Sequence, residues 1–187
     1  MDDIPNCAGR LLVAPPQLTD PNFTGSVVLV LMHDDNGAFG LVLNDPIEST
    51  RVTPDELVSQ WASVVTAPVL RGGPVQTDGI LGLGEPLPGR HVDGFTHLGD
   101  APQPLGAVDL SRPPTDGLSR IRLFAGYSGW APHQLDAELA MDGWVVVDAH
   151  PDDAFADDLG GLWSRVIRRQ AGANTIIAAL PDDLSLN

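Results

Sequence analysis

Lysine is absent from this sequence, and all ten of its basic residues are arginine. Against 25 acidic residues, this leaves a formal net charge of −15. Affinity for nucleic acid depends largely on cations that neutralise phosphates, and the sequence contains no recognisable DNA-binding motif. The densest group of bases, Arg165, Arg168 and Arg169, suits the last turns of a helix, where cations complement the helix dipole. We therefore expect no direct binding of nucleic acid.

Cysteine is nearly absent too, since Cys7 is the single one and no intramolecular disulfide can form. Long hydrophobic runs are missing: the apolar run at 27–32 has six residues, too few to cross a bilayer. The N-terminus, MDDIPNCAG, is acidic and lacks the apolar segment of a signal peptide. These absences predict a cytoplasmic protein with no membrane partner.

The length of 187 residues is typical of one domain. No linker and no internal repeat divides the chain, so we predict a single domain over 1–187. Hydrophobic residues make up 43% of the chain, which argues against disorder of the whole. Glycine and proline, with 20 and 17 residues, favour short strands and turns over long helices.

Apolar patterning predicts a hairpin-linked sheet. Asn36-Gly37 is a strong signal for the turn between two strands. Strands are predicted at 11–14, 26–33, 39–43, 80–84, 92–98, 120–125 and 144–149, with a further strand near the C-terminus. Because the early strands are joined by a hairpin, the sheet should be mixed or mainly antiparallel.

Helices are predicted between and after these strands. Thr53 and Pro54 are typical of a helix start, and an apolar stripe through Trp61 continues at helical spacing to residue 65. Further helices are predicted at 132–142 and after residue 150, where Leu162 and Val166 belong to a second stripe. The fold class is therefore α+β.

Two glycine-rich segments suggest chemistry but fit turns better. Gly126-Tyr127-Ser128-Gly129-Trp130 resembles a nucleophile elbow, yet the bulky Trp130 stands where that motif needs glycine. We interpret it as a tight strand-to-helix turn with a structural Ser128. The bend Arg71-Gly72-Gly73-Pro74 offers backbone N–H groups to an anion but lacks the rest of a phosphate loop. The five histidines have no metal-site spacing, so we predict no metal and no cofactor.

Three ordered segments carry a resemblance to a known family. They are GRLLVAPPQLTDPNFTGSVVLVLMHDDNGAFGLVLNDP at 9–46, RGGPV at 71–75 and FAGYSGWAPHQLDAEL at 124–139. Together they resemble the AlgH/YqgE-like proteins, a largely uncharacterised bacterial family. The resemblance implies a strongly curved, barrel-like sheet flanked by helices. It also carries a transcriptional-regulator label, linked in one branch to alginate control.

The resemblance also singles out polar and turn-forming positions. As candidates for binding a ligand or partner we take Asp20, Asn22, His33, Asn44, Gly72, Gly73, Tyr127, Trp130, Gln134 and Glu138. We expect them to converge on one face; the competing interpretation is a buried polar network that ties the sheet to a helix. Two positions depart from the family pattern: Asp45 replaces the usual arginine, and His133 replaces a glycine. Both departures weaken the expectation of an intact anion site.

The leading functional hypothesis is a non-enzymatic regulatory or interaction protein that acts indirectly, through an unknown protein or small-molecule partner. One alternative is a small-molecule-binding domain with its ligand near the motif loops. Another is an enzyme of unknown class that uses Asp20, His33 or Glu138 as an acid or base.

Overall fold

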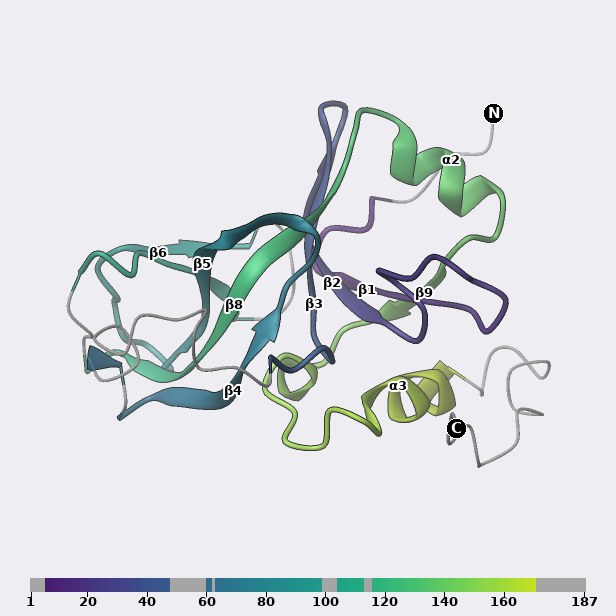
Figure 1. The fold of residues 1–187 in the computed structure, drawn as a ribbon. Helices are drawn as coiled ribbons and strands as arrows, with labels where there is room; N and C mark the ends of the chain where they lie inside the picture. The colour runs from purple at the N-terminus through teal and green to yellow at the C-terminus, as the bar shows by residue number, and fades with distance from the viewer. Residues whose placement is uncertain (1–5, 48–59, 62, 99–103, 113–115, 171–187) are drawn as a thin grey trace.

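The computed structural model describes residues 6–47, 60–61, 63–98, 104–112 and 116–170 (Figure 1). The strands are β1 (Arg10–Val13), β2 (Val27–Asp34), β3 (Gly37–Val42), β4 (Val65–Arg71), β5 (Val75–Pro86), β6 (Phe95–His97), β7 (Gly106–Val108), β8 (Leu118–Trp130) and β9 (Val145–Asp148). The helices in these ranges are α2 (Gln134–Ala140), α3 (Leu162–Gln170) and a short 3-10 turn, η1 (Pro151–Asp153). The predicted terminal strand lies outside the described residues.

The strands form one curved sheet in the order β6-β7-β5-β8-β3-β2-β1-β9, with β4 paired to β8. Among the described strands all pairs are antiparallel except β4 with β8. The predicted α+β fold with a curved, mainly antiparallel sheet is confirmed. Figure 1 shows the sheet as two halves, which meet where β8 pairs with β3. The strands from β4 to β8 form one, which we call the β4–β8 half, and β1, β2, β3 and β9 form the other, which we call the β1–β3–β9 half.

The predicted hairpin between β2 and β3 is present. Asp34 pairs with Gly37, so Asp35 and Asn36 form a two-residue loop. The ladder contains an irregularity between Val30 and Met32. A residue inserted there shifts the alternation of side chains along the outer end of β2.

Strand β8 is longer than the sequence indicated. The predicted tight turn at 126–130 is wrong, because the chain stays extended and Gly40 of β3 pairs with Ser128. Gly126 has a φ of 68°, a backbone conformation that glycine adopts without a steric penalty. The strand can therefore bend at Gly126 without ending, and it contributes to both halves of the sheet.

The helix predicted at 53–65 lies mostly outside the described residues, but its last part is wrong. Val65 begins β4, where it pairs in parallel with Ile121 of β8. Trp61 is buried, as the apolar stripe predicted, and packs beside Ile121 and Leu123 in the core of the β4–β8 half. The stripe thus identified Trp61 as a core residue, whereas its last member, Val65, belongs to a strand.

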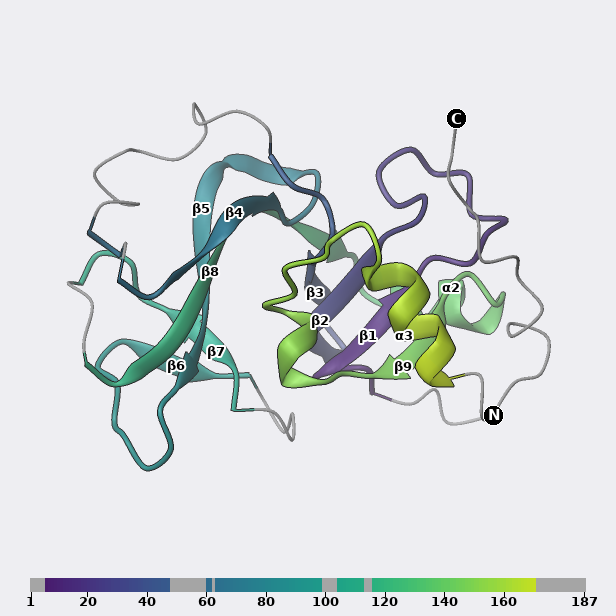
Figure 2. The ribbon, with the colours of Figure 1, turned by 90° about the horizontal axis from the view of Figure 1, so that it is seen from below.

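The β1–β3–β9 half is covered on both faces (Figures 1 and 2). Along β1, Leu11 and Val13 belong to one hydrophobic cluster, which also contains Leu162, Val166 and Ile167 of the α3 stripe. Leu12 belongs to the other cluster, which includes Leu135 of α2. This alternation follows from the two-residue period of a strand. The two helices therefore lie on opposite faces of the same strands.

Candidate functional site

The carboxylate of Glu138 lies between two tryptophans. Its Oε2 accepts hydrogen bonds from Trp130 Nε1 at 2.9 Å and Trp144 Nε1 at 2.7 Å, and its Oε1 accepts one from Gln134 Nε2 at 3.0 Å. Gln134 Oε1 in turn accepts the backbone N–H of Ala131 at 3.0 Å. Both indoles are buried, so these bonds satisfy donors that water hardly reaches. Three of the motif residues thus form one network that fixes α2 to the end of β8.

The loop before β2 enters this network through Phe23. Its ring stacks on Trp130, with centroids 6.1 Å apart, and meets Trp144 edge-on at 5.5 Å. Asp20 and Asn22 are exposed; the Asp20 carboxylate accepts the backbone N–H of Asn22 at 2.8 Å and closes the turn. The loop is therefore ordered by local capping and by one aromatic anchor.

Asn44, which follows β3, binds the end of the same loop. Its Oδ1 accepts the N–H of Val27 at 2.9 Å, and its Nδ2 donates to the carbonyl of Gly25 at 2.9 Å. The first bond extends the pairing of β2 with the β3 side of the hairpin, where the Leu43 N–H also donates to the Val27 carbonyl at 2.8 Å. Both polar atoms of the Asn44 side chain are thus bonded within the chain.

His33 connects the hairpin to α2. Its Nδ1 accepts the backbone N–H of Cys7 at 3.2 Å, so Nε2 carries the proton and lies 3.2 Å from Asp136 Oδ1. The His33 side chain is 8% exposed and the Asp136 side chain 30%. Burial raises the pKa of the neighbouring Cys7 thiol, Arg10 lowers it, and Asp136 raises it further. A thiol held protonated in this way is a weak nucleophile.

The departure at residue 133 has a geometric consequence. His133 precedes α2 with a φ of 62°, in the left-handed region that suits the glycine usual in the family. Its side chain makes no capping hydrogen bond, and Nδ1 lies 3.5 Å from Asp136 Oδ2. The helix therefore starts from a residue under backbone strain.

Gly72 and Gly73 lie where β4 passes β8. A Cβ on Gly72 would collide with the carbonyl oxygen of Gly126, and one on Gly73 with the backbone of Tyr127. The Gly72 carbonyl accepts the N–H of Val42 at 2.9 Å and the Ser128 hydroxyl at 3.1 Å. Close backbone approach explains these glycines, and the Ser128 hydroxyl is buried and bonded.

The second departure from the family pattern is Asp45, whose carboxylate is ion-paired with Arg71. Asp45 Oδ2 lies 3.4 Å from Arg71 Nη1, and the Asp45 carbonyl accepts the Arg71 backbone N–H at 2.7 Å. The arginine that could have joined an anion site beside Gly72 is thus paired with a carboxylate.

The motif residues meet, but on two faces of the sheet. Trp130, together with the residues bonded to Glu138, lies on the face covered by α2. Tyr127 packs with the cluster on the opposite face, and its ring lies 4.6 Å from that of Phe39. Loop, hairpin, glycine bend and helix are therefore contiguous around β8, whereas their side chains do not share one open surface.

An open cleft lies beside the hairpin, at the outer end of β2. It has a volume of about 520 Å³ and is lined by Asn6, Ala8, Leu31, Met32, His33, His97 and Leu98. We call it the hairpin cleft. Met32 is 48% exposed there. Of the sequence-predicted residues, His33 is the one that contributes to its lining.

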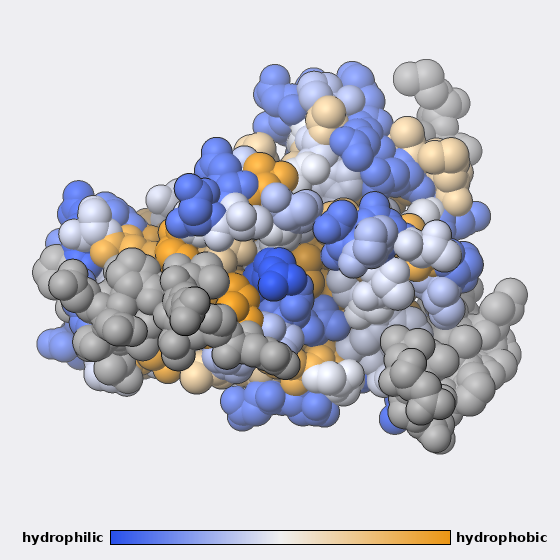
Figure 3. Space-filling view, in the orientation of Figure 1, coloured by the Kyte–Doolittle hydropathy of each residue, from blue (hydrophilic) through white to orange (hydrophobic). Residues whose placement is uncertain are grey.

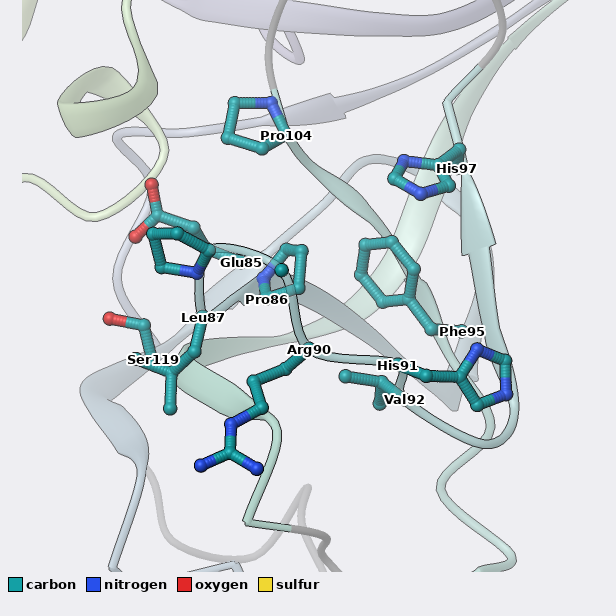
Figure 4. A pocket seen from close by; sticks show the side chains of 12 residues that line it. Glu85, Pro86, Leu87, Arg90, His91, Val92, Phe95, His97, Pro104 and Ser119 are labelled. Carbon is teal, nitrogen blue, oxygen red and sulfur yellow. The ribbon is translucent and has the colours of Figure 1, made fainter.

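A larger pocket lies in the β4–β8 half (Figure 4). It has a volume of about 650 Å³ and is lined by residues 85–92 together with Phe95, His97, Pro104 and Ser119. We call it the loop pocket. No sequence pattern predicted it, because its walls come from the loop predicted at 85–90 and from strands distant in sequence.

Two arginines of β8 connect the two halves. Arg120 binds Glu85 and Asp152, at 2.8 and 2.6 Å, and lies over the Phe155 ring. Arg122 is buried, and its Nη2 donates to the Ala156 carbonyl at 3.0 Å. Burial lowers the pKa of Arg122 to about 10. The segment after β9 is thereby held against β8.

Sequence comparisons identify relatives over nearly the whole chain. The sequence model of the AlgH-like family matches residues 11–175. A UPF0301 protein of Streptomyces avermitilis is 42% identical over 196 residues, covering 100% of this chain and 98% of the relative. A UPF0301 protein of Thermobifida fusca is 43% identical over 190 residues, covering 96% and 94% of the two chains.

Solved structures share the fold. A crystal structure of a Corynebacterium diphtheriae protein superposes with a TM-score of 0.81 at 29% identity, covering 96% of this chain and 95% of that one. The solution structure of AlgH from Pseudomonas aeruginosa has a TM-score of 0.65 at 25% identity, covering 98% of each chain.

Proposed function

Because this chain belongs to the AlgH-like family, we propose that it is a non-enzymatic regulatory protein that acts through a protein partner rather than by contacting DNA. The observation that carries the proposal is the hairpin cleft, where exposed Met32 and its neighbour His33 on β2 lie with His97 of β6. We further propose that the protein is cytoplasmic. Across the described ranges no helix is both long and apolar enough to cross a membrane.

The composition of the cleft suits a protein side chain. Leu31, Met32 and Leu98 supply apolar surface, while Asn6 and His97 supply polar side chains to the lining. Methionine is flexible and polarisable, and it is frequent at surfaces that accept partners. Such a combination of an apolar centre and a polar rim is typical of protein interfaces.

The arginines support the part of the proposal that concerns DNA. Within the described ranges, ion pairs with carboxylates engage Arg10, Arg71, Arg112, Arg120 and Arg169. Arg169 belongs to the C-terminal group of three and binds the buried Asp153 at 2.8 Å. Phosphate contacts would have to compete with these pairs on a chain of charge −15.

The residues considered for acid–base catalysis all have internal partners. Glu138 accepts bonds from two indoles, and both ring nitrogens of His33 are engaged. Asp20 caps an exposed turn. Within the described part of the chain, no group of three His, Cys, Asp or Glu side chains could hold a metal ion. A binding role needs none of these groups to titrate.

The test is capture of the partner with matched surface variants. Tagged wild type, Met32→Glu and Met141→Glu would be used to purify partners from the host, with quantitative mass spectrometry. Met141 is 73% exposed at the end of α2, away from the cleft, so it controls for the added charge. We expect one protein to be lost with Met32→Glu and retained with Met141→Glu. Identical partner profiles for all three proteins would refute the cleft as the interface.

The DNA statement has its own assay. Fluorescence anisotropy with random and host promoter duplexes should show no sub-micromolar binding near physiological salt. Tight binding that weakens steeply as salt rises would be the signature of phosphate contacts and would overturn the proposal.

A further inference from the structure

The loop pocket has the size of a small-molecule site. Its volume of about 650 Å³ falls in the usual range for such sites, roughly 300–1,000 Å³. In the view of Figure 3, most of the strongly hydrophobic surface lies over the β4–β8 half of the molecule. The loop pocket and the hairpin cleft are separate sites, because their linings differ in every residue except His97. The proposal below therefore does not depend on the partner-binding role proposed above.

The rim of the pocket is formed without a ligand. Leu87 to Arg90 make a β-turn closed by Arg90 N–H donating to the Leu87 carbonyl at 3.0 Å. Pro88 occupies its second position, and Gly89 its third with a φ of 70°, as a type II turn requires. The Leu87 N–H is anchored to the Gly117 carbonyl at 2.7 Å. A rim that is already ordered reduces the entropy that the loop would lose when a ligand binds.

The inner wall is apolar and flat. Figure 4 shows the Phe95 ring beside His97, with Pro86 and Pro104 around the same space. The Phe95 and His97 rings meet edge to face, with centroids 4.9 Å apart. The half-buried Phe95 ring therefore offers a surface on which a planar apolar group can pack.

Two carboxylates near the pocket have partners within the chain, and one arginine lies on its rim. Glu85 is ion-paired with Arg120 at 2.8 Å, and the Asp93 carboxylate lies 3.1 Å from His91 Nε2. Arg90 is exposed on the rim, and no carboxylate of the described residues is ion-paired with it. An arginine so placed can bind a carboxylate or a phosphate with two parallel hydrogen bonds.

We propose that the loop pocket binds a small organic anion, with a planar apolar body against Phe95 and a carboxylate or phosphate group on Arg90. No residue of this site was among the sequence-predicted candidates, since none belongs to the family motifs.

Binding can be measured with three probes of the same body: naphthoate, naphthyl phosphate and the uncharged naphthalenemethanol. Calorimetry and NMR titration of the labelled full chain should give a dissociation constant of about 1 mM or tighter for an anion of this size. Amide shifts should map to Val92, Phe95 and His97. The alcohol should bind about tenfold more weakly than the better anion.

Variants separate the anion contact from the apolar wall. Arg90→Gln should weaken the anions about tenfold and leave the alcohol unchanged, while Phe95→Leu should weaken all three probes. Arg71→Gln, which removes an exposed arginine on β4, is the matched control and should have no effect.

Several results would overturn the proposal: no saturable binding of either anion, equal affinity for the alcohol, or shifts that map outside the pocket. Should Arg90→Gln fail to fold, the comparison of anions with the alcohol on the wild type decides. The tighter of the two anions identifies the class of head group. Failure here would leave the Met32-dependent partner test unaffected, because the two experiments use different sites.

Discussion

Replacing Glu138 with alanine removes the acceptor shared by two buried indoles. Trp130 and Trp144 are 6% and 7% exposed, so their N–H groups would lose a partner where water hardly reaches. A buried donor without an acceptor costs about 1–3 kcal/mol. Two such donors give about 2–6 kcal/mol, and some water entry favours the lower half. We expect Glu138→Ala to lower the free energy of unfolding by about 3 kcal/mol.

Glu138→Gln should have an intermediate effect. The amide oxygen can still accept from both indoles, but the amide nitrogen then faces Gln134 Nε2, another donor. Gln134 can turn its amide only by giving up its bond to the Ala131 N–H. We expect a loss of about 1 kcal/mol, the usual net value of one hydrogen bond.

The measurement is urea unfolding followed by circular dichroism and tryptophan fluorescence, whose transitions should coincide if unfolding is two-state. Asp78→Ala removes an equal charge from an exposed position and controls for the lower self-repulsion of the chain. In NMR exchange experiments, the indole protons of Trp130 and Trp144 should lose protection in Glu138→Ala. A change in stability below about 1 kcal/mol, with protection retained, would refute the network as a structural element.

Three further predictions concern the same region. His133→Gly should raise stability by up to about 1 kcal/mol, because glycine adopts the positive φ without strain. Its control, Ala137→Gly within α2, should lower stability by about 1 kcal/mol. Equal effects of the two variants in urea titrations would contradict the strain assigned to His133. Gly72→Ala should cost about 2–3 kcal/mol because its Cβ meets the Gly126 carbonyl, while Gly160→Ala, with its nearest neighbour 3.9 Å away, should fold normally. Burial raises the pKa of the Cys7 thiol above its ordinary value of 9.0, so on raising the pH the unfolded chain loses the thiol proton before the folded chain does. Stability should therefore fall as pH rises above that value. Cys7→Ala should lack this decline in denaturant titrations.

Local signals predicted the parts of the fold that are local. The hairpin at 35–36 and the α3 stripe follow from contacts between residues close in sequence. Strand β4 could not be predicted in this way, because its valines also fit a helical stripe. Its partner is β8, some 55 residues later, as Val65 paired with Ile121 shows. The turn predicted at 126–130 failed because Gly126 bends the strand without ending it.

The candidate site shows the same limit. The resemblance selected Trp130, Gln134 and Glu138, which bind one another, but it did not select Trp144, the second indole on the same carboxylate. A usable signal was present: a buried indole N–H needs an acceptor, and Glu138 lies close before Trp144 in the sequence. The cavities were not predicted, since their walls join segments that no sequence pattern connects.

Strand β8 has a consequence for how such a protein can change over generations. Its first part pairs with β4 and β5, and its last three residues pair with β3. A recombination that exchanged one half of the sheet for that of a distant relative would therefore have to cut a strand on which the other half depends. Loops such as the rim at Leu87–Arg90 can be exchanged freely by comparison. New specificity in this architecture should arise by substitution of loops, with the shared strand inherited whole.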